Sequence, residues 1–430
     1  MASSRGQSAP EPKETRFWHP FANMANVAGH EIVFERGQGA WLWDAGGQKY
    51  LDATAGLWYC YVGHGRAELA EAAAHQMRTL SSYSTFGNFA NQPILDLAER
   101  VCALAPIPNA VAFFTNGGSD GIDTAAKLIR RYWNLKGQPQ RRLMVVREGA
   151  FHGMNAYGTS LAGIDINAAG YGELVGGVIR VDPHDPEALA DLLAQRGSEV
   201  AAFFGEPVRG AVGVHPPGQG YWQQIERLCR EHGVFLVMDE VVTGFGRLGS
   251  WFASERFGIS PDLIVGAKGI TSGYIPLGVV ICGEKIQEPF WRESGNAFRH
   301  GYTYSGHATA AAVGIANLDI IEREQLVDRV TELEPMLAAE LAELTKSDLV
   351  QEVRTVGLLA GVQLVPSLVE DHPELIDDVV SEARQRGVIT RGLVGGSLQI
   401  SPPLIISPDE IHHLVEVLAE SLSVRQKKLG

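Results

Sequence analysis

The chain has 430 residues, enough for one large domain and a smaller one, and 45% of them are hydrophobic. Its formal net charge of −14 argues against nucleic acid as a partner. No apolar run approaches the roughly 20 residues of a membrane span. The four cysteines are scattered, without a CxxC pair or zinc spacing, which indicates reduced thiols in a cytoplasmic protein and no metal site.

The N-terminal part of the chain contains two kinds of sequence. Residues 1–15 are rich in Ser, Pro and Gln and are expected to form a flexible leader. Residues 16–65 are rich in aromatic residues and glycine. Within them, Ala40–Asp44 and Lys49–Asp52 flank the turn residues Ala45-Gly46-Gly47, a pattern that predicts a β-hairpin.

The middle of the chain alternates apolar, β-rich runs with stretches of helical periodicity. The expected helices begin near Glu68 and cover Pro93–Ala105, Asp120–Trp133 and Tyr221–Glu231. The expected strands are Ala110–Phe114, Leu143–Val146, Val178–Val181, Ala201–Phe204, Val234–Met238, Leu263–Gly266 and Leu277–Cys282. This alternation predicts a mainly parallel sheet with helices on both faces. In such sheets functional residues gather at the carboxyl ends of the strands.

The C-terminal part is expected to be an α+β unit. A long helical stretch, Ala308–Glu343, is followed by further alternating elements. These are the apolar runs Leu349–Val353, Gly361–Leu364 and Leu398–Ile400, a helix over Leu375–Arg386 and a last helix from Pro408.

The first chemical cue is a strand that ends in an acid. The expected strand Val234–Met238 runs directly into Asp239, and a carboxylate in that place lies at the mouth of a cleft. A helix cap or a turn cap is the other interpretation of a single acid. A metal-binding acid of the Walker B type is disfavoured, because the chain has no GxxxxGK[ST] loop.

The second cue is a lysine that follows another expected strand. Lys268 stands between Ala267 and Gly269, and these small neighbours leave room for a bulky group. Most lysines are solvated, but a lysine desolvated in a cleft has a lowered pKa and becomes a nucleophile for carbonyls. Lys268 and Asp239 together would suit pyridoxal phosphate, which needs a lysine for its aldehyde and an acid for its pyridine nitrogen.

The third cue is a possible phosphate cup. After the apolar run Ala110–Phe114, the residues Thr115–Asp120 include Gly117, Gly118 and Ser119 and lead into a helix. Glycines at a helix N-terminus let backbone N–H groups converge on an anion, and a serine adds a hydroxyl donor. A plain turn with a helix cap is the alternative interpretation.

A dinucleotide-binding pattern must be weighed against these cues. Gly244–Gly249 matches GxGxxG, and Asp262 lies near the distance expected for a ribose-binding acid. However, Asp239–Thr243 separates the glycines from the strand, and no long helix is expected before Pro261. The pattern therefore gives weak support for NAD binding.

Long stretches around the acid and the lysine resemble class III pyridoxal-phosphate aminotransferases. They are Asp239–Arg247, Pro261-Asp262 and Ala267–Gly278, and the resemblance extends from Trp18 to about Leu404. It implies an α/β protein of fold type I. Such a protein has a large domain with a mostly parallel, seven-stranded type of sheet flanked by helices, and a small α+β domain.

The resemblance also implies the limits of the domains. Both ends of the chain, residues 16–65 and 320–430, would form the small domain. Residues 66–319 would form the large, cofactor-binding domain. A homodimer with shared active sites, or a tetramer built from it, is expected.

The resemblance further implies roles at the cofactor. Lys268 is expected to carry pyridoxal phosphate as a Schiff base and Asp239 to bind its pyridine nitrogen. The other expected cofactor-binding residues are Gly118, Ser119, Phe151, His152, Glu206, Val241 and Thr303, of which Thr303 would reach the phosphate in the partner subunit.

The substrate side is expected to be aromatic, with one arginine. Trp58, Phe86 and Phe151 would line the substrate pocket, and Arg391 would be a mobile arginine that pairs with a substrate carboxylate. Ornithine- and GABA-type relatives tend to have Gln where this chain has Val241, which favours the omega-amino acid or amine:pyruvate group.

These features predict ping-pong transamination from an omega-amino acid or amine to a keto acid, with pyruvate as the expected acceptor. Three alternatives remain open. The chain could be a diaminopelargonate-, GABA- or ornithine-type aminotransferase. It could catalyse another reaction on the same scaffold, as a mutase, decarboxylase or racemase. It could also be a non-enzyme or a NAD-binding protein.

Overall fold

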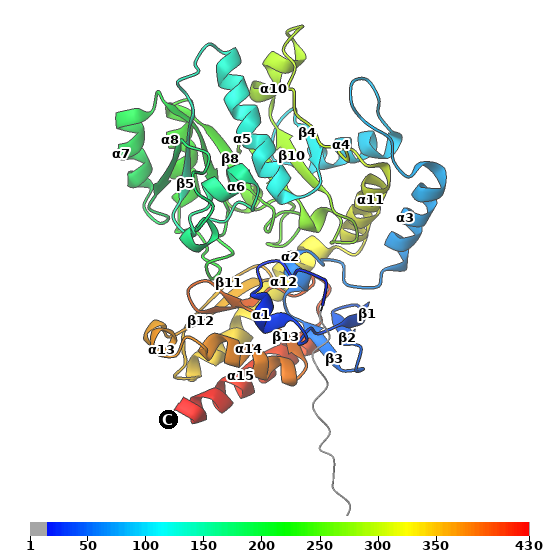
Figure 1. Ribbon diagram of the computed structural model, residues 1–430, viewed down its shortest axis with the longest axis vertical. Coiled ribbons are helices and arrows are strands. Elements are labelled where there is room, and N and C mark those ends of the chain that lie inside the picture. Colours follow the sequence, from blue (N-terminus) through cyan, green and yellow to red (C-terminus); the bar gives the residue numbers. More distant parts are fainter. Residues whose placement is uncertain (1–14, 430) are drawn as a thin grey trace, which may run out of the picture.

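The upper lobe in Figure 1 is built on a seven-stranded sheet of order β4-β10-β9-β8-β7-β5-β6. The computed structural model describes residues 15–429, so residues 1–14 of the expected leader lie outside the described part. The strands are β4 (Val111–Thr115), β5 (Leu143–Arg147), β6 (Val178–Val181), β7 (Val200–Gly205), β8 (Phe235–Asp239), β9 (Leu263–Gly266) and β10 (Gly278–Cys282). In this sheet β10 pairs antiparallel with both β4 and β9, and the other six strands all run in the opposite direction to it, which confirms the mostly parallel sheet.

Both faces of this sheet are buried, which explains why its strands read as continuous apolar runs. Neighbouring residues along a strand point to opposite faces, so in β8 Leu236 packs into one core and Val237 into the other. The helices that cover the faces are α5 (Gly118–Leu135), α6 (Ala156–Leu161) and α10 (Glu284–Trp291) on one side, and α7 (Pro186–Arg196) and α8 (Tyr221–Glu231) on the other.

The lower lobe contains two four-stranded sheets, of order β1-β2-β3-β13 and β11-β12-β15-β14. The expected hairpin is confirmed, because β2 (Trp41–Asp44) and β3 (Lys49–Asp52) pair antiparallel. The other strands are β1 (Phe34–Gln38), β11 (Val350–Val356), β12 (Leu359–Leu364), β13 (Val388–Ile389), β14 (Gly392–Leu393) and β15 (Ser397–Ile400). Since β13 pairs parallel with β3, the two ends of the chain share one sheet.

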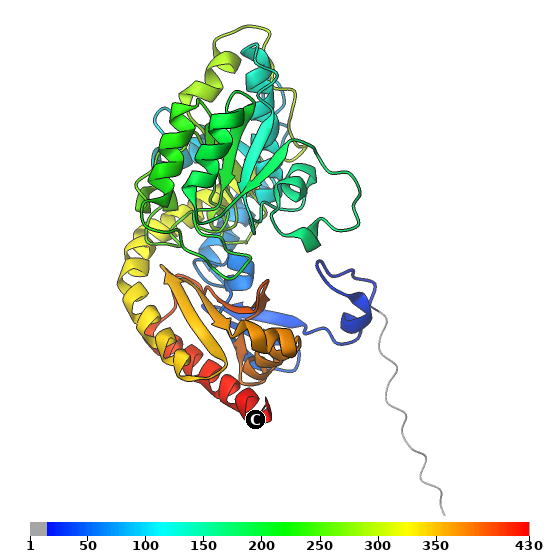
Figure 2. The same cartoon turned by 90° about the vertical axis from the view of Figure 1, so that its left-hand side faces the viewer.

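The expected helical stretch over 308–343 consists of two helices. They are α11 (Ala308–Arg323) and α12 (Leu326–Ala342), and the chain turns at Gln325, whose φ of 51° is left-handed. The helices need different directions, because α11 packs on helices of the upper lobe and α12 packs on β11 and α15 of the lower lobe. In Figure 2 the two yellow helices run along one side of the molecule and connect the lobes.

The remaining helices complete the two lobes. They are α1 (Met24–Val27), α2 (Ala55–Trp58), α3 (Ala67–Leu80), α4 (Gln92–Leu104), α9 (Ala253–Arg256), α13 (Pro366–Asp371), α14 (Leu375–Gln385) and α15 (Pro408–Leu429). Across residues 15–429, none of the helices has both the length and the apolar character required to cross a membrane.

The segment that matches the dinucleotide pattern has the wrong structure for that ligand. Gly244–Gly249 forms turns and leads only into the four-residue helix α9. A dinucleotide pyrophosphate binds at the N-terminus of a helix that directly follows a strand. The segment therefore lacks the element that would bind it.

Arg247, in this same segment, ties the upper lobe to the lower one. Its side chain is fully buried, and its Nη1 donates to the carbonyl oxygens of Leu358 at 3.0 Å and Pro402 at 2.5 Å. Its guanidinium also lies 4.4 Å from the ring centre of Tyr61. One buried cation thus satisfies backbone acceptors from two separate segments of the lower lobe.

Replacing Arg247 by methionine should lower the free energy of unfolding by about 2–4 kcal/mol, because two buried carbonyl groups lose a charged donor. Chemical denaturation measures the change. Arg227→Met is the control, since Arg227 is exposed and its ion pair is with Glu231 on the same helix, and it should change stability by about 0.5 kcal/mol or less. Equal midpoints for the two variants would contradict the assigned role of Arg247.

Candidate active site

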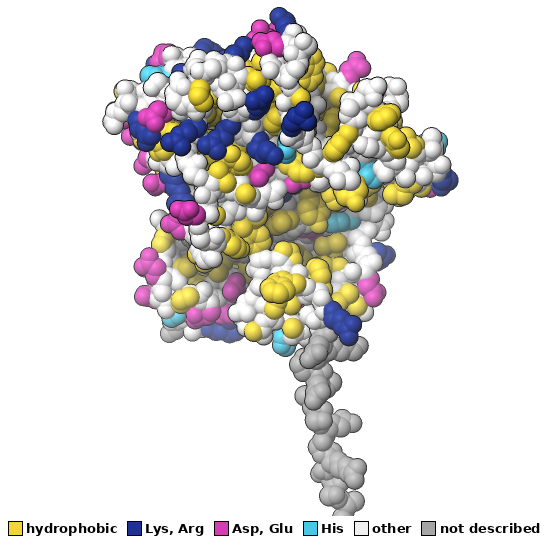
Figure 3. All heavy atoms as spheres, turned by 45° about the horizontal axis from the view of Figure 1, so that its top comes forward, with side chains coloured by type: hydrophobic (Ala, Val, Ile, Leu, Met, Phe, Trp, Pro, Cys, Tyr) yellow, Lys and Arg dark blue, Asp and Glu magenta, His cyan; other side chains and the backbone are white. Residues whose placement is uncertain are grey.

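A cavity of about 470 Å³ lies between the two lobes, and Figure 3 shows the hollow, with hydrophobic side chains along it. Segments from both lobes line this cavity. The residues are Trp58, Tyr59, Asn116, Gly117, Gly118, Ser119, Ile122, Phe151, His152, Gly153, Glu206, Val208, Ala211, Asp239, Val241, Val242, Thr243, Ala267, Lys268, Thr271, Gly273, Ile275, Pro276 and Leu277.

The charged groups of the cavity come from the carboxyl ends of three neighbouring parallel strands. Glu206 follows β7, Asp239 ends β8, and Lys268 follows β9 by two residues. The register places Gly205 beside Met238 and Asp239 beside Val265. The three side chains therefore converge because parallel strands end at the same edge of the sheet.

Lys268 sits in a strained turn that is held from several sides. Its φ of 48° is left-handed, and the following Gly269 packs so tightly against Tyr61 that an added Cβ would lie 2.3 Å from the ring. Asn317 Nδ2 donates to the carbonyl oxygens of Gly269 at 2.8 Å and Ile270 at 3.1 Å. Strain of this kind persists only where the surroundings enforce it, which is typical of functional sites.

The environment of Lys268 makes its amine partly neutral near neutral pH. Burial is the main cause, and it lowers the pKa from 10.5 to about 8; the charge of Arg391 lowers it further, while Asp239 and Glu206 oppose the shift. The nitrogen lies 5.3 Å from the ring centre of Trp58. A lysine with such a pKa can act as a nucleophile and as a base.

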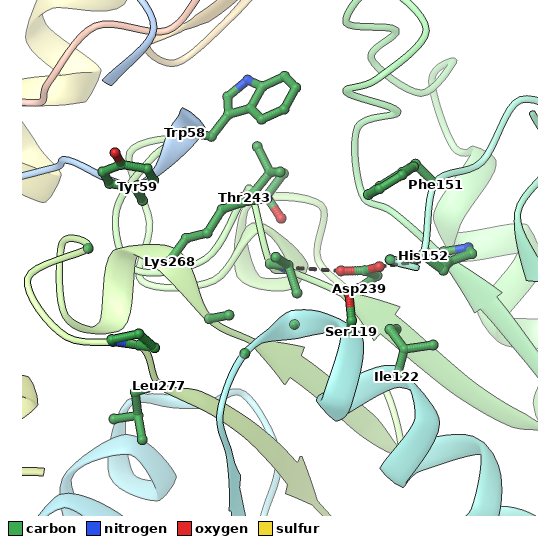
Figure 4. A pocket seen from close by; sticks show the side chains of 18 of the residues that line it. Trp58, Tyr59, Ser119, Ile122, Phe151, His152, Asp239, Thr243, Lys268 and Leu277 are labelled. Atoms are coloured by element: carbon green, nitrogen blue, oxygen red, sulfur yellow. Dashed lines mark hydrogen bonds and ion pairs between the residues drawn. The ribbon is translucent and has the colours of Figure 1, made fainter. Parts of the chain in front are cut away.

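Asp239 is buried and held by two hydrogen bonds. His152 Nδ1 donates to its Oδ2 at 2.8 Å, and the backbone N–H of Val241 donates to its Oδ1 at 3.2 Å (Figure 4). His152 is fully buried. The carboxylate is thus oriented toward the cavity to receive a cationic or N–H partner.

Glu206 connects two loops at the cavity. Its Oε1 accepts from the backbone N–H of Phe151 at 3.0 Å, and its Oε2 accepts from that of Gly210 at 3.1 Å. Burial raises the pKa of Glu206, and Asp239 adds to this shift. This carboxylate thus holds the backbone of Phe151, whose ring lines the cavity and is seen in Figure 4 beside Asp239 and His152.

The N-terminus of α5 opens onto the same cavity. The first N–H groups of a helix have no partner within the helix, so they favour an anion. A Cβ on Gly117 would meet nothing within 4 Å, whereas a Cβ on Gly118 would lie 2.8 Å from Val241. Ser119 Oγ accepts from the N–H of Met154 at 3.1 Å, which leaves its own hydrogen available for an anion.

Trp58 closes the cavity from the lower lobe. It follows Gly56 in a turn where both residues have left-handed φ values, 62° and 67°. The buried carboxylate of Asp52 holds this turn by accepting from the N–H groups of Thr54 at 3.0 Å and Gly56 at 2.7 Å. The indole ring is buried, and its nitrogen has no hydrogen-bond partner among the described residues.

Three expected site residues lie outside the cavity lining. Arg391 is half-buried against Trp58, with its guanidinium 4.4 Å from the indole ring centre. Phe86 is 55% exposed, and Thr303 is also exposed. The other expected residues line the cavity, namely Trp58, Gly118, Ser119, Phe151, His152, Glu206, Asp239, Val241 and Lys268.

Sequence reasoning missed several residues that shape the site. Tyr59, Asn116 and Thr243 line the cavity, and Asp52 holds the turn that carries Trp58. Asn116 could have been found, since it follows the strand that leads into the glycines. Asp52 gave no local signal, because its partners became clear only from the turn geometry.

The groups around the cavity fit pyridoxal phosphate. Lys268 offers an amine of lowered pKa for the aldehyde, and Asp239 offers a carboxylate for the pyridine nitrogen. The N-terminus of α5 with Ser119 suits the phosphate, and Phe151 suits the ring. Residues 15–429 contain no group of three His, Cys, Asp or Glu side chains placed to bind a metal ion.

Comparison with known proteins agrees with this donor set. Residues 23–422 match the sequence model of the family described as aminotransferase class-III. The putrescine–pyruvate aminotransferase of Pseudomonas aeruginosa is 37% identical and covers 94% of this chain and 93% of its own length. The solved structure of an (S)-enantioselective omega-transaminase from Thermomicrobium roseum has a TM-score of 0.90 at 38% identity, and covers 95% of this chain and 96% of that one.

A third comparison concerns the cofactor directly. An amine transaminase from an uncultivated Pseudomonas species, solved in its PLP-bound form, has a TM-score of 0.90 at 34% identity, and covers 98% of this chain and all of that one. The fold is therefore that of the fold type I transferases that use pyridoxal phosphate. Within this class, the chain belongs to the class-III aminotransferases.

The lowered pKa of Lys268 predicts how the cofactor-free protein responds to pH. Between pH 8 and 10.5 the unfolded chain binds more protons than the folded one, so stability should rise with pH. From pH 7.5 to 9.5 the contribution of Lys268 should be about 2 kcal/mol. Denaturant titrations of the wild type and of Lys268→Met isolate this contribution, since the variant lacks the titrating amine. An equal pH dependence in the two proteins would refute it.

Proposed function

We propose that this aminotransferase moves an amino group from an amine or omega-amino acid to pyruvate by a ping-pong mechanism. The carrying observation is that one cavity brings together the Lys268 amine, the Asp239 carboxylate and the N-terminus of α5. The choice of substrates is supported by relatives named for putrescine–pyruvate, beta-alanine–pyruvate and omega-amino acid–pyruvate transfer.

Each residue of the cavity has a defined task in this proposal. Lys268 holds the cofactor at rest, and once released, its neutral Nζ moves a proton from the donor carbon. Asp239, oriented by His152, keeps a proton on the pyridine nitrogen. Bound pyridoxal phosphate supplies an electron sink for the charge that develops at the donor carbon. Ser119 and the N-terminus of α5 hold the phosphate, and Phe151 stacks on the ring.

The substrate side combines an apolar wall with one cation. Trp58 presents a buried indole to the cavity, which suits the apolar part of an amine donor. Arg391 lies against this indole and could pair with the carboxylate of pyruvate in a bidentate contact. Val241 would lie near the cofactor ring.

We also propose a homodimer with shared active sites. Phe86 and Thr303 are exposed and lie outside the cavity of their own chain, and the Phe86 ring neighbours Gly301 on the loop that carries Thr303. Both residues would contribute to the partner's site. The small and large domains would divide at about residues 65 and 320, and the free thiols of Cys60, Cys102, Cys229 and Cys282 suit a cytoplasmic protein.

The half-reaction tests the proposed chemistry. With an amine donor and no acceptor, the loaded enzyme should release one equivalent of ketone or aldehyde per chain and then stop, because the amino group stays on the enzyme. Pyruvate should restart the reaction and yield alanine, and Lys268→Ala should abolish both steps. Continuous release of carbon dioxide, ammonia or an isomer from the donor alone would instead indicate another reaction on this scaffold.

The role of Arg391 can be tested separately. Arg391→Ala removes the only cation proposed to bind the acceptor carboxylate, so the KM for pyruvate should rise about tenfold or more. The kcat/KM for an apolar amine such as 1-phenylethylamine should change much less. If the variant has the same KM for pyruvate as the wild type, Arg391 does not bind the pyruvate carboxylate.

A further inference from the structure

Arg391 is not among the residues that line the cavity, and two contacts hold its side chain. Its Nε donates to Gln399 Oε1 at 2.6 Å, and its guanidinium lies over the Trp58 ring. Burial lowers its pKa, and no charged neighbour among the described residues offsets this shift. The arginine therefore rests on a neutral amide and an indole face, both weaker partners than a carboxylate.

Gln399 cannot turn its amide around without a loss of hydrogen bonds. The residue is fully buried, and its Nε2 donates to Ser401 Oγ at 2.7 Å. Ser401 Oγ in turn donates to the carbonyl oxygen of Thr54 at 3.3 Å. Since a serine hydroxyl has a single hydrogen, the reversed amide would place its oxygen against an occupied donor and its NH₂ against Arg391. The network thus aims Oε1 at the arginine.

The backbone around Gln399 is rigid, whereas the arginine side chain is long. The N–H of Gln399 donates to the carbonyl oxygen of Arg391 at 2.9 Å, and Thr390 Oγ1 donates to that of Gln399 at 2.7 Å. These bonds continue the pairing of β14 with β15. The Arg391 side chain can therefore leave or take up its bond to Oε1 without any change in the strands.

We infer that Gln399 is a positioning residue that holds the Arg391 side chain against Trp58. It thereby sets how well the site binds apolar amines relative to carboxylate substrates. This inference rests on the proposed function. While Arg391 is bonded to Gln399, the cavity presents the indole of Trp58 and suits an apolar donor. A carboxylate substrate must draw the guanidinium away from Gln399. A weaker bond between Gln399 and Arg391 therefore favours carboxylate substrates, and a stronger bond disfavours them.

Two substitutions should move substrate binding in opposite directions. Gln399→Met keeps the length of the side chain but removes the acceptor, and should lower the KM for pyruvate about fivefold while raising the KM for 1-phenylethylamine. Gln399→Glu pairs Arg391 with a fixed carboxylate, and should raise the KM for pyruvate about tenfold. In both variants kcat should change little. A merely structural role for Gln399 would not produce opposite shifts.

The matched control is Gln363→Met. Gln363 is a buried glutamine of the same sheet that lies outside the cavity lining, and its Oε1 accepts from Arg354 at 3.0 Å and from Ser397 Oγ at 2.6 Å rather than from Arg391. It should leave both KM values unchanged. Titration of the holoenzyme with propionate, a carboxylate that cannot react, gives a second readout: its affinity should rise in Gln399→Met and fall in Gln399→Glu.

The outcomes separate this inference from the proposed function. If the wild type does not use pyruvate, the proposed function fails, while the affinities for propionate still test whether Gln399 holds Arg391. The positioning role of Gln399 is overturned if both Gln399 variants shift the affinity for propionate in the same direction or not at all. It is also overturned if Gln399→Met has the same effect in an Arg391→Ala background, because the effect must pass through that arginine.

Discussion

The placement of an amine beside two carboxylates in a desolvated cavity is the constraint on which this structure depends. Burying charged groups is costly unless each has a partner. Lys268, Asp239 and Glu206 come together because they stand at the ends of three adjacent parallel strands, and the two acidic side chains favour the charged form of Lys268 while Arg391 opposes it. Burial outweighs the two acidic side chains and lowers the pKa of Lys268 to about 8, so its amine is partly neutral near neutral pH.

Buried hydrogen bonds hold the charged side chains and the neighbouring loops of the cavity in place. His152 orients Asp239, and the carboxylate of Glu206 holds the backbone of Phe151. The adjacent Glu240 is fully buried, and it accepts from the backbone N–H groups of Ala253 and Ser254. These buried hydrogen bonds fix the positions of the groups that face the cavity.

The lower lobe carries the residues proposed to meet the substrate on chain segments that are far apart in sequence. Asp52 and Trp58 come from the N-terminal part, and Arg391 and Gln399 from the C-terminal part. The parallel pairing of β3 with β13 joins these parts in one sheet. The groups proposed to hold the cofactor thus rest mostly on the upper lobe and those proposed to meet the substrate on the lower lobe, so their separation depends on how the lobes pack, with Arg247 as one of the ties between them.

The sequence by itself determined which segments carry the candidate chemical groups. Asp239 and Lys268 follow apolar runs, and the glycines precede a helix; these are local patterns with local physical causes. It also pointed to the parallel sheet, the hairpin and the aminotransferase family. It did not show the break at Gln325, because helical periodicity continues through that residue while the packing of the two lobes requires a turn. Only the tertiary structure decided that Arg391 rests on Trp58 and Gln399, and that Phe86 and Thr303 lie outside their own cavity. These facts depend on contacts between distant segments, which no local pattern of residues encodes.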